Sequence, residues 1–280
     1  MYSDTHFHFH YQAEKEGLET AANVLAEMAD NNVFFGMDIG TDCRDLIKRR
    51  DIVLQTLEYL DEDRRKKAQA FMHFSAGIWP DEESIADRYK CMEELQNQIK
   101  AFKEDGGIFS DRLAAIGEGG LDHHWDAHPY EGELFEMQLA LAKKMDLPFV
   151  VHSRDAYQDT YACIKNAGWN KGIIHCYSYG LEEAKAFLNL GWYISLSGSV
   201  TYTKKSKMED MKKLLAYIPD DRILLETDSP YLAPVPMRGN PNNPNFVKYT
   251  YAFVADSRNV SPEELSDLVD CNIKKLFNLK

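Results

Sequence analysis

Six residues with metal-binding side chains stand at or near the ends of short apolar runs. They are four histidines and two carboxylates: His6, His8, Glu118, His152, His175 and Asp228. Imidazole and carboxylate groups are common ligands of catalytic divalent metals, and a carboxylate can bridge two ions. If the apolar runs are parallel strands of one sheet, their carboxyl ends meet and the six side chains form one site. The pattern therefore predicts a hydrolase that uses two divalent metal ions.

The histidines divide into a closely spaced pair and two isolated residues. His6 and His8 are two positions apart, so both side chains point to the same side of a strand. His10 has the same parity, and the spacing alone also allows His8 and His10 as the pair. A single buried histidine is more often a core residue than a ligand. His152 and His175 nevertheless end two different runs, which favours ligation for both.

The two carboxylates also end apolar runs. Glu118 is flanked by glycines at 117 and 119, which let the backbone lie close to a bound group. Without a metal, a buried carboxylate at this place would need an arginine as its partner. Asp228 ends the last run, and Glu226 lies one step deeper on the same face. Glu226 is therefore a candidate for orienting one of the ligands by a hydrogen bond.

The apolar runs are short and bounded by Gly, Pro, Asp or Ser, as buried parallel strands are. Strands are predicted at roughly 2–8, 33–40, 68–77, 113–121, 148–153, 172–177, 192–198 and 223–228. Helical periodicity separates them, at 18–29, 43–60, 82–104, 134–145, 155–167, 180–190 and 206–217. A capping-box pattern at 261–264 predicts the start of a further helix near the C-terminus.

Strands that alternate with helices indicate the α/β class and a single (β/α)₈ TIM-type barrel over residues 1–280, with an extra C-terminal helix. The alternative is an open, doubly wound sheet. That sheet would spread the six residues across its width, because they follow strands one, four, five, six and eight. A closed barrel gathers them around one mouth. The proline-rich segment 234–244 follows strand eight, so we expect it to overhang this mouth.

The composition and the first residues predict an intracellular protein. No apolar segment is long enough to span a membrane, and the N-terminus lacks the features of an export signal. Five scattered cysteines indicate free thiols in a reducing compartment. The net charge of −13 disfavours a broad nucleic-acid-coating surface, although bound cations would bring positive charge to a pocket. We therefore expect a cytoplasmic protein, with no membrane association and no obligate protein partner.

Several longer motifs surround the six residues, at 4–8, 116–122, 152–156, 175–178, 226–232 and 238–244. With these motifs the chain resembles the TatD family of metal-dependent deoxyribonucleases along essentially its whole length. The resemblance implies a TIM-like barrel of the amidohydrolase superfamily and selects His6 and His8 as the histidine pair. It also implies two metal ions that share Glu118. One would be held by His6, His8, Glu118 and Asp228, and the other by Glu118, His152 and His175.

Two residues depart from the family's pattern. Trp79 precedes Pro80 at a position where the family often has histidine, which affects one polar contact with the substrate. Gly119 replaces a branched apolar residue, and we expect this change to loosen the packing behind Glu118. Neither change alters a candidate ligand.

The leading hypothesis is hydrolysis of DNA phosphodiester bonds by a water that two divalent ions activate. The resemblance suggests a 3′–5′ exonuclease acting on single strands or 3′ ends. Glu118 and Asp228 are the catalytic candidates, with Asp228 orienting the water and taking its proton. Guanidinium groups pair well with phosphate, so the arginines are the first candidates for substrate contacts. The full set of these candidates is Arg154, Arg238, Asn242 and His124.

Two alternatives use the same six residues. The site could instead hydrolyse a small phosphate ester, an amide or a lactone, or it could bind metal in a non-catalytic scaffold. Six ligands for two ions leave coordination positions for water, which favours catalysis. The metals considered are Mg²⁺, Mn²⁺ and Zn²⁺. Histidine-rich ligation suits Zn²⁺ and Mn²⁺, whereas Mg²⁺ prefers oxygen ligands.

Overall fold

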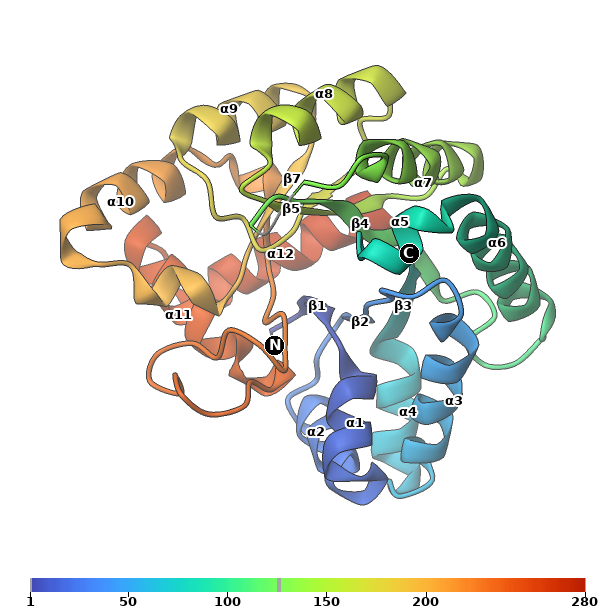
Figure 1. Cartoon of the computed structure of the whole chain (residues 1–280). Coiled ribbons are helices and arrows are strands. Elements are labelled where there is room, and N and C mark those ends of the chain that lie inside the picture. The colour runs from blue at the N-terminus through green and yellow to red at the C-terminus, as the bar shows by residue number, and fades with distance from the viewer. Residues whose placement is uncertain (1, 125–126, 280) are drawn as a thin grey trace.

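The described residues of the computed structural model, 2–124 and 127–279, form eight strands in one parallel sheet (Figure 1). The order of the strands in the sheet is their order in the chain. The strands are β1 (Asp4–Phe7), β2 (Gly36–Asp38), β3 (Met72–Ala76), β4 (Leu113–Asp122), β5 (Phe149–Arg154), β6 (Gly172–Ile174), β7 (Tyr193–Leu196) and β8 (Ile223–Leu225). Most are buried on both faces, as expected for strands covered by helices.

The sheet closes into a barrel between its first and last strands. Beyond β8 the chain continues beside β1, where the Asp228 amide donates to the His6 carbonyl at 2.9 Å. The His8 amide donates to the Ser229 carbonyl at 2.8 Å, and Phe7 and Ser229 form a parallel bridge. This seam brings the ends of β1 and β8 together and confirms the predicted barrel over the open sheet.

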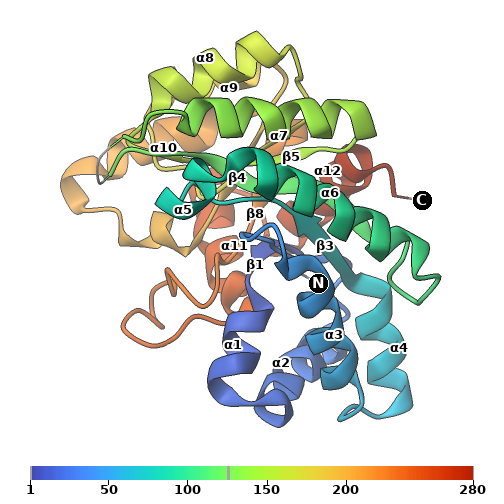
Figure 2. The same ribbon diagram turned by 45° about the vertical axis from the view of Figure 1, so that its right-hand side comes forward.

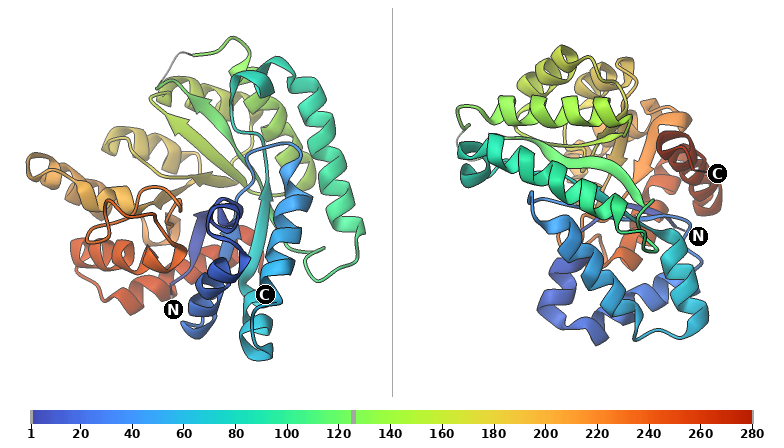
Figure 3. Two further views of the ribbon diagram at one scale, coloured as in Figure 1. Left: turned by 60° about the horizontal axis from the view of Figure 1, so that its bottom comes forward. Right: turned by 90° about the vertical axis from the view of Figure 1, so that its right-hand side faces the viewer.

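Helices surround the strands, with α1–α4 on one side and α7–α9 on the opposite side (Figures 2 and 3). The helices that precede β4 are α1 (Phe9–Glu16), α2 (Leu18–Asp30), α3 (Asp45–Leu57), α4 (Glu62–Phe71), α5 (Glu82–Ala86) and α6 (Arg88–Glu104). Those that follow it are α7 (Glu131–Met145), α8 (Tyr157–Ala167), α9 (Leu181–Asn189), α10 (Met208–Tyr217), α11 (Val247–Arg258) and α12 (Pro262–Phe277). Short 3₁₀ turns are η1 (Gly198–Tyr202), η2 (Lys205–Lys207), η3 (Asp220–Arg222) and η4 (Pro244–Phe246).

The predicted elements differ from the structure in one strand start, one missed helix and one divided helix. The strand predicted at 68–77 begins only at Met72, because the preceding residues belong to α4, whose N-terminus is capped by Asp61. The Asp61 side chain accepts a hydrogen bond from the backbone amide of Arg64 at 3.0 Å, which stabilises the N-terminus of the helix. Helix α1 was not predicted. The helix predicted at 82–104 is divided at Asp87 into α5 and α6.

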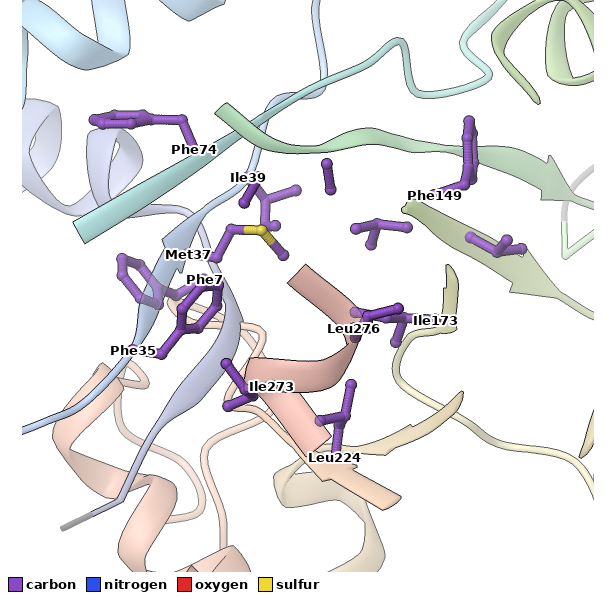
Figure 4. Packing of buried hydrophobic residues seen from close by; sticks show 14 of the residues in the cluster. Phe7, Phe35, Met37, Ile39, Phe74, Phe149, Ile173, Leu224, Ile273 and Leu276 are labelled. Carbon is purple, nitrogen blue, oxygen red and sulfur yellow. The ribbon is translucent and has the colours of Figure 1, made fainter. Parts of the chain in front are cut away.

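Helix α12 covers the end of the barrel where the strands begin. The side-chain amide of Asn272 donates to the carbonyl of Ile223, the first residue of β8, at 2.9 Å. Ile273 and Leu276 of α12 point among apolar side chains of the strands (Figure 4). The predicted capping box at Ser261 is present and begins this helix. Because α12 closes this end, the opposite end of the barrel is left as the place for a site.

No helix in the described part of the chain is long and apolar enough to cross a membrane.

Asp270 of α12 makes the stability of the fold depend on pH. Burial raises the pKa of its carboxyl to about 6, and the Ser3 hydroxyl donates to it at 2.5 Å. A carboxyl with a raised pKa binds its proton more tightly in the folded chain than in the unfolded chain. Protonation of Asp270 therefore stabilises the folded chain. This contribution is complete below the unfolded pKa of about 4 and is lost as the pH rises through about 6.

We therefore expect Asp270→Asn to stabilise the protein at pH 8, by about 2 kcal/mol, and by less than half as much at pH 4.5. Urea unfolding at the two pH values measures this difference. Glu263→Gln removes the same charge from an exposed position on the same helix and serves as the control. An equal effect of Asp270→Asn at both pH values would contradict the assignment.

Candidate metal centre

The open end of the barrel holds a cavity of about 770 Å³. All but one of the six predicted ligands line it, namely His8, Glu118, His152, His175 and Asp228. The remaining ligand, His6, is fully buried, and its ring stacks on the His175 ring with centroids 4.0 Å apart. The fold thus brings the six side chains together although they come from five different strand ends.

Glu118 lies at the centre of the cluster, and its two carboxylate oxygens face different residues. Oε2 is 3.4 Å from His6 Nε2 and 3.7 Å from His8 Nε2. Oε1 is 2.8 Å from His152 Nδ1 and 3.0 Å from His175 Nε2. Each oxygen of the carboxylate therefore faces its own pair of imidazoles.

Asp228 completes the side of the cluster that faces Oε2. Its Oδ1 atom is 3.6 Å from His6 Nε2 and 3.5 Å from His8 Nε2. The backbone of Asp228 has φ of 56°, a left-handed conformation that aspartate tolerates better than most residues. This turn follows directly after the segment that pairs with β1, and it directs the carboxylate toward the two histidines. The distances group His6, His8 and Asp228 around one oxygen of Glu118.

The side chains present fit a divalent metal. Neither ring nitrogen of His6 makes a hydrogen bond to any described residue, although the ring is fully buried. A buried polar atom without a partner is costly, and a metal ion would supply the missing partner for Nε2. Ligand atoms of His6, His8 and Glu118 lie within 4.8 Å of one another, as do those of Glu118, His152 and His175. Imidazole with carboxylate is a donor set suited to such an ion.

The second nitrogen of each remaining histidine faces an acceptor that fixes the ring. His8 Nδ1 lies 3.3 Å from the carbonyl of Ile39, and His152 Nε2 lies 2.9 Å from Asp122 Oδ2. Acceptors at these positions orient the rings and turn the other nitrogen of each toward Glu118.

Glu226 lies behind His175, the position that an orienting partner of a ligand would occupy. Its Oε1 atom lies 3.4 Å from His175 Nδ1, and it accepts a hydrogen bond from the Cys176 amide at 2.6 Å. The Ser195 hydroxyl donates to its second oxygen at 2.5 Å. These bonds hold the fully buried carboxylate of Glu226 behind His175.

Asp122 is a functional candidate that the sequence analysis did not assign. It lies on β4 with the same parity as Glu118, and this parity was the available signal. Both carboxylates contact the same His152 ring, one at each nitrogen. Asp122 therefore determines how His152 is presented to the cluster.

Electrostatics within the cluster favour ionised carboxylates. Burial opposes ionisation of Glu118, but the surrounding imidazoles, led by His175, hold the pKa of its carboxyl well below the usual range. Burial lowers the pKa of His175, but the charge of Glu118 outweighs it and raises that pKa well above the usual value. The carboxylate of Glu118 is thus held in its ionised form at the centre of the cluster.

The four predicted substrate contacts lie in different places. Arg154 is exposed and lines the cavity. His124, Arg238 and Asn242 are not among the described residues that line it. The His124 ring is 41% exposed at the rim, 3.0 Å from Asp155. Only Arg154 therefore stands beside the ligand cluster.

Asn242 and Arg238 contact neighbouring loop residues instead. The Asn242 amide is buried and donates to the carbonyls of Thr227 and Tyr231 at 2.9 and 2.5 Å. These bonds hold the Asn242 side chain against the backbone of the segment that follows β8. The guanidinium of Arg238 lies over the Tyr202 ring, 4.4 Å from its centroid.

The sequence profile described as TatD related DNase matches residues 3–278. The chain belongs to this family. A metal-dependent hydrolase of Bacillus subtilis, YabD, is 31% identical over 284 residues and is matched over the full length of both chains. The chain is also similar to the crystal structure of YjjV, a TatD homologue from Escherichia coli K12. That similarity has a TM-score of 0.79 and 25% identity, and it covers 100% of this chain and 98% of the other.

A third relative carries a more specific name. The 3′-5′ ssDNA/RNA exonuclease TatD of Rahnella sp. is 35% identical over 175 residues, which cover 60% of this chain and 66% of that protein. Together, the family and its relatives make this TatD protein a metal-dependent hydrolase that acts on ester bonds.

The two residues in which this TatD protein departs from the family pattern, Gly119 and Trp79, both lie near the buried side-chain amide of Gln138. The space next to Gly119 is filled by Gln138, because an added Cβ at 119 would lie 2.6 Å from its amide nitrogen. The Gln138 amide accepts from the Ile78 amide at 2.8 Å and donates to the Ile78 carbonyl at 2.9 Å. Packing behind Glu118 is therefore filled by a hydrogen-bonded side chain, contrary to the expected loosening.

Gln138 hydrogen-bonds to the backbone of Ile78, and Trp79 is the next residue of the chain. The Trp79 indole lines the cavity and meets the His152 ring edge to face, with centroids 5.7 Å apart and an interplanar angle of 70°. Its amide donates to the Thr41 carbonyl at 2.8 Å. Trp79 thus replaces a polar group at this position by an apolar wall beside the ligand cluster.

We expect Gly119→Ala to destabilise this TatD protein by about 1–3 kcal/mol, because the new methyl displaces the Gln138 amide from Ile78. Urea unfolding measures the change. Gly132→Ala is the matched control, since the atom nearest an added Cβ there, Cys163 Sγ, is at an ordinary 3.5 Å. In the Gln138→Ala background, Gly119→Ala should cost almost nothing. Additive costs of the two substitutions would show that the two residues do not act through one contact.

Proposed function

We propose that this protein hydrolyses phosphodiester bonds of DNA at a centre of two divalent metal ions, as a 3′–5′ exonuclease on single strands or 3′ ends. The observation that carries the proposal is the division of the imidazoles by Glu118, with His6 and His8 at one oxygen and His152 and His175 at the other. A carboxylate placed in this way is suited to bridging two ions.

Because each oxygen of Glu118 faces different histidines, each proposed ion has its own set of ligands. His6, His8 and Asp228 would hold one ion with Glu118 Oε2, and His152 and His175 would hold the other with Oε1. When bound, the ions lower the pKa of water and offset negative charge on the reacting phosphate. Mg²⁺, Mn²⁺ and Zn²⁺ are the candidates, and the nitrogen-rich set favours the latter two. All of these ligands come from residues 1–280, so we propose one barrel domain that needs no partner chain.

Asp228 is proposed to orient the attacking water and to accept its proton. Its side chain is 15% exposed, whereas those of His6 and Glu118 are 1% and 5% exposed. Burial opposes ionisation, but the hydrogen bond from His8 and the charge of His6 keep the pKa of Asp228 below its ordinary value. An ionised carboxylate at the cavity side of the cluster is therefore available as a base.

The substrate is proposed to bind through the cavity wall. Arg154 carries an exposed guanidinium beside the ligand cluster, suited to contact with a phosphate group. The Trp79 ring offers an apolar face for a sugar or base. The family profile and the named activity of the Rahnella relative support nucleic acid as the substrate.

A small phosphate ester, amide or lactone is the alternative substrate. A solved structure of an engineered lactonase template shares the fold, with a TM-score of 0.69 at 12% identity. That similarity concerns the barrel alone and gives no support for a shared substrate.

Hydrolysis of end-labelled DNA tests the proposal. Single- and double-stranded DNA labelled at the 3′ or 5′ end is incubated with Mg²⁺, Mn²⁺ or Zn²⁺, and with a chelator as control. The proposal predicts metal-dependent shortening of 5′-labelled strands one nucleotide at a time. Internal cuts would contradict the exonuclease, and hydrolysis of only small esters under every metal would favour the alternative.

A further inference from the structure

Two loops at the mouth of the barrel differ in charge from the rest of the chain. The chain has 45 acidic and 32 basic residues, yet the segments 193–208 and 229–248 contain no acidic residue. The first segment carries Lys204, Lys205 and Lys207, and the second carries Arg238 and Lys248. Both segments follow strand ends, β7 and β8, where the loops of a barrel form its mouth.

The two loops are joined into one surface, which we call the β7–β8 ledge (residues 198–207 and 231–240). The Val235 amide donates to the Thr201 hydroxyl at 2.9 Å, and the Tyr202 hydroxyl donates to the Ala233 carbonyl. The Arg238 guanidinium packs over the Tyr202 ring. These contacts hold the charge of the second loop beside the first.

The basic groups of the ledge are exposed and lack acidic partners. Lys204, Lys205, Lys207 and Arg238 are all exposed, and none forms an ion pair with a described residue. Some lysines elsewhere are paired, as Lys66 is with Glu62 at 2.5 Å. Four unpaired positive charges on an acidic chain form a local site of attraction for a polyanion.

The ledge adjoins the cavity directly. Ser199, Tyr231 and Leu232 belong to the ledge and also line the cavity that contains the ligand cluster. The opposite part of the rim carries Asp81, which forms no ion pair with a described residue and whose negative charge repels phosphate. Charge therefore distinguishes one approach to the cavity from the other.

An exposed aromatic ring lies where the ledge meets the cavity. Tyr231 is 54% exposed, and its ring centroid is 6.2 Å from that of His8. Exposed aromatic rings next to basic side chains are typical of surfaces that bind single strands, because unpaired bases stack on the rings. This combination favours a single strand over a duplex as the occupant.

We propose that the phosphate backbone of a single-stranded nucleic acid crosses the β7–β8 ledge, with the strand's end in the cavity. This inference rests on the proposed nuclease function. With a 3′ end at the metal centre, the nucleotides on its 5′ side lie along Lys204, Lys205 and Lys207. The ledge thus determines the direction in which the strand leaves the cavity, and it adds affinity only for substrates long enough to reach it.

The test compares substrates of two lengths. The variant Lys204→Gln/Lys205→Gln/Lys207→Gln is compared with Lys100→Gln/Lys103→Gln/Lys144→Gln, which removes three exposed lysines from α6 and α7. KM is measured for a dinucleotide and for a single strand of about twelve nucleotides at several salt concentrations. For the ledge variant, we expect KM for the long strand to rise about tenfold more than KM for the dinucleotide. We also expect its salt dependence to fall by about two in log–log slope.

The outcomes separate the inference from the function on which it rests. Equal behaviour of the two triple variants on the long strand, with normal cleavage by the unaltered protein, overturns the ledge and leaves the nuclease intact. A similar rise in KM for both substrates in the ledge variant also overturns the ledge, because the effect would then not depend on reach. If the unaltered protein cleaves neither substrate with any metal, the proposed function fails first.

Discussion

Glu118→Gln should abolish the proposed nuclease activity and reduce the proposed content of two metal ions per chain to one or none. One carboxylate oxygen becomes an NH₂ group, whose hydrogens point at an imidazole nitrogen that should face a metal. Because Oε1 and Oε2 each face two histidines, either orientation of the amide disrupts one ion site. We expect kcat to fall by at least about a thousandfold, or about 4 kcal/mol of transition-state stabilisation.

Metal analysis of the purified variant and cleavage of a labelled single strand measure the two effects. Glu133→Gln is the control, since Glu133 lies on the barrel exterior in an ion pair with Arg88. Thermal unfolding of both variants checks that the barrel is folded. Full activity of Glu118→Gln with unchanged metal content would refute the central role of this carboxylate.

Asp228→Asn should lower kcat by about 10²–10⁴-fold even at saturating metal, because asparagine cannot accept the proton of the attacking water. The substitution keeps one oxygen that can bind an ion, so the loss of activity should exceed the loss of metal. His8→Asn provides the comparison. His8 faces the same ion position but has no proposed role in proton transfer, so excess metal should restore much of that variant's activity.

Activity and bound metal are measured for both variants over a range of metal concentrations. Recovery of Asp228→Asn to the kcat of the unaltered protein in excess metal would show that Asp228 is a ligand alone. Failure of both variants to recover would leave ligation as the common role and would remove the evidence for a separate base.

The sequence determined the class of fold and the six ligand candidates for local reasons. Parallel strands buried on both faces appear as short apolar runs, and a polar residue that ends such a run must lie at the carboxyl edge of the sheet. The parity of His6 and His8 placed both side chains on one face. Boundaries were predicted less well, because Ala68 and Phe71 are apolar whether they face the core from a helix or from a strand.

The tertiary structure alone decided which of these residues face one another. Closure of the barrel between β1 and β8 brings Asp228 beside His6, and no local pattern specifies that contact between residues 222 positions apart. The same holds for the Gln138 amide that fills the space beside Gly119, and for Arg238, which the fold places on Tyr202. The sequence by itself specifies which side chains reach the mouth of the barrel, because strand period and strand end are local properties. Their pairing and the route by which a substrate reaches them depend on loops and helices that meet only after the barrel closes.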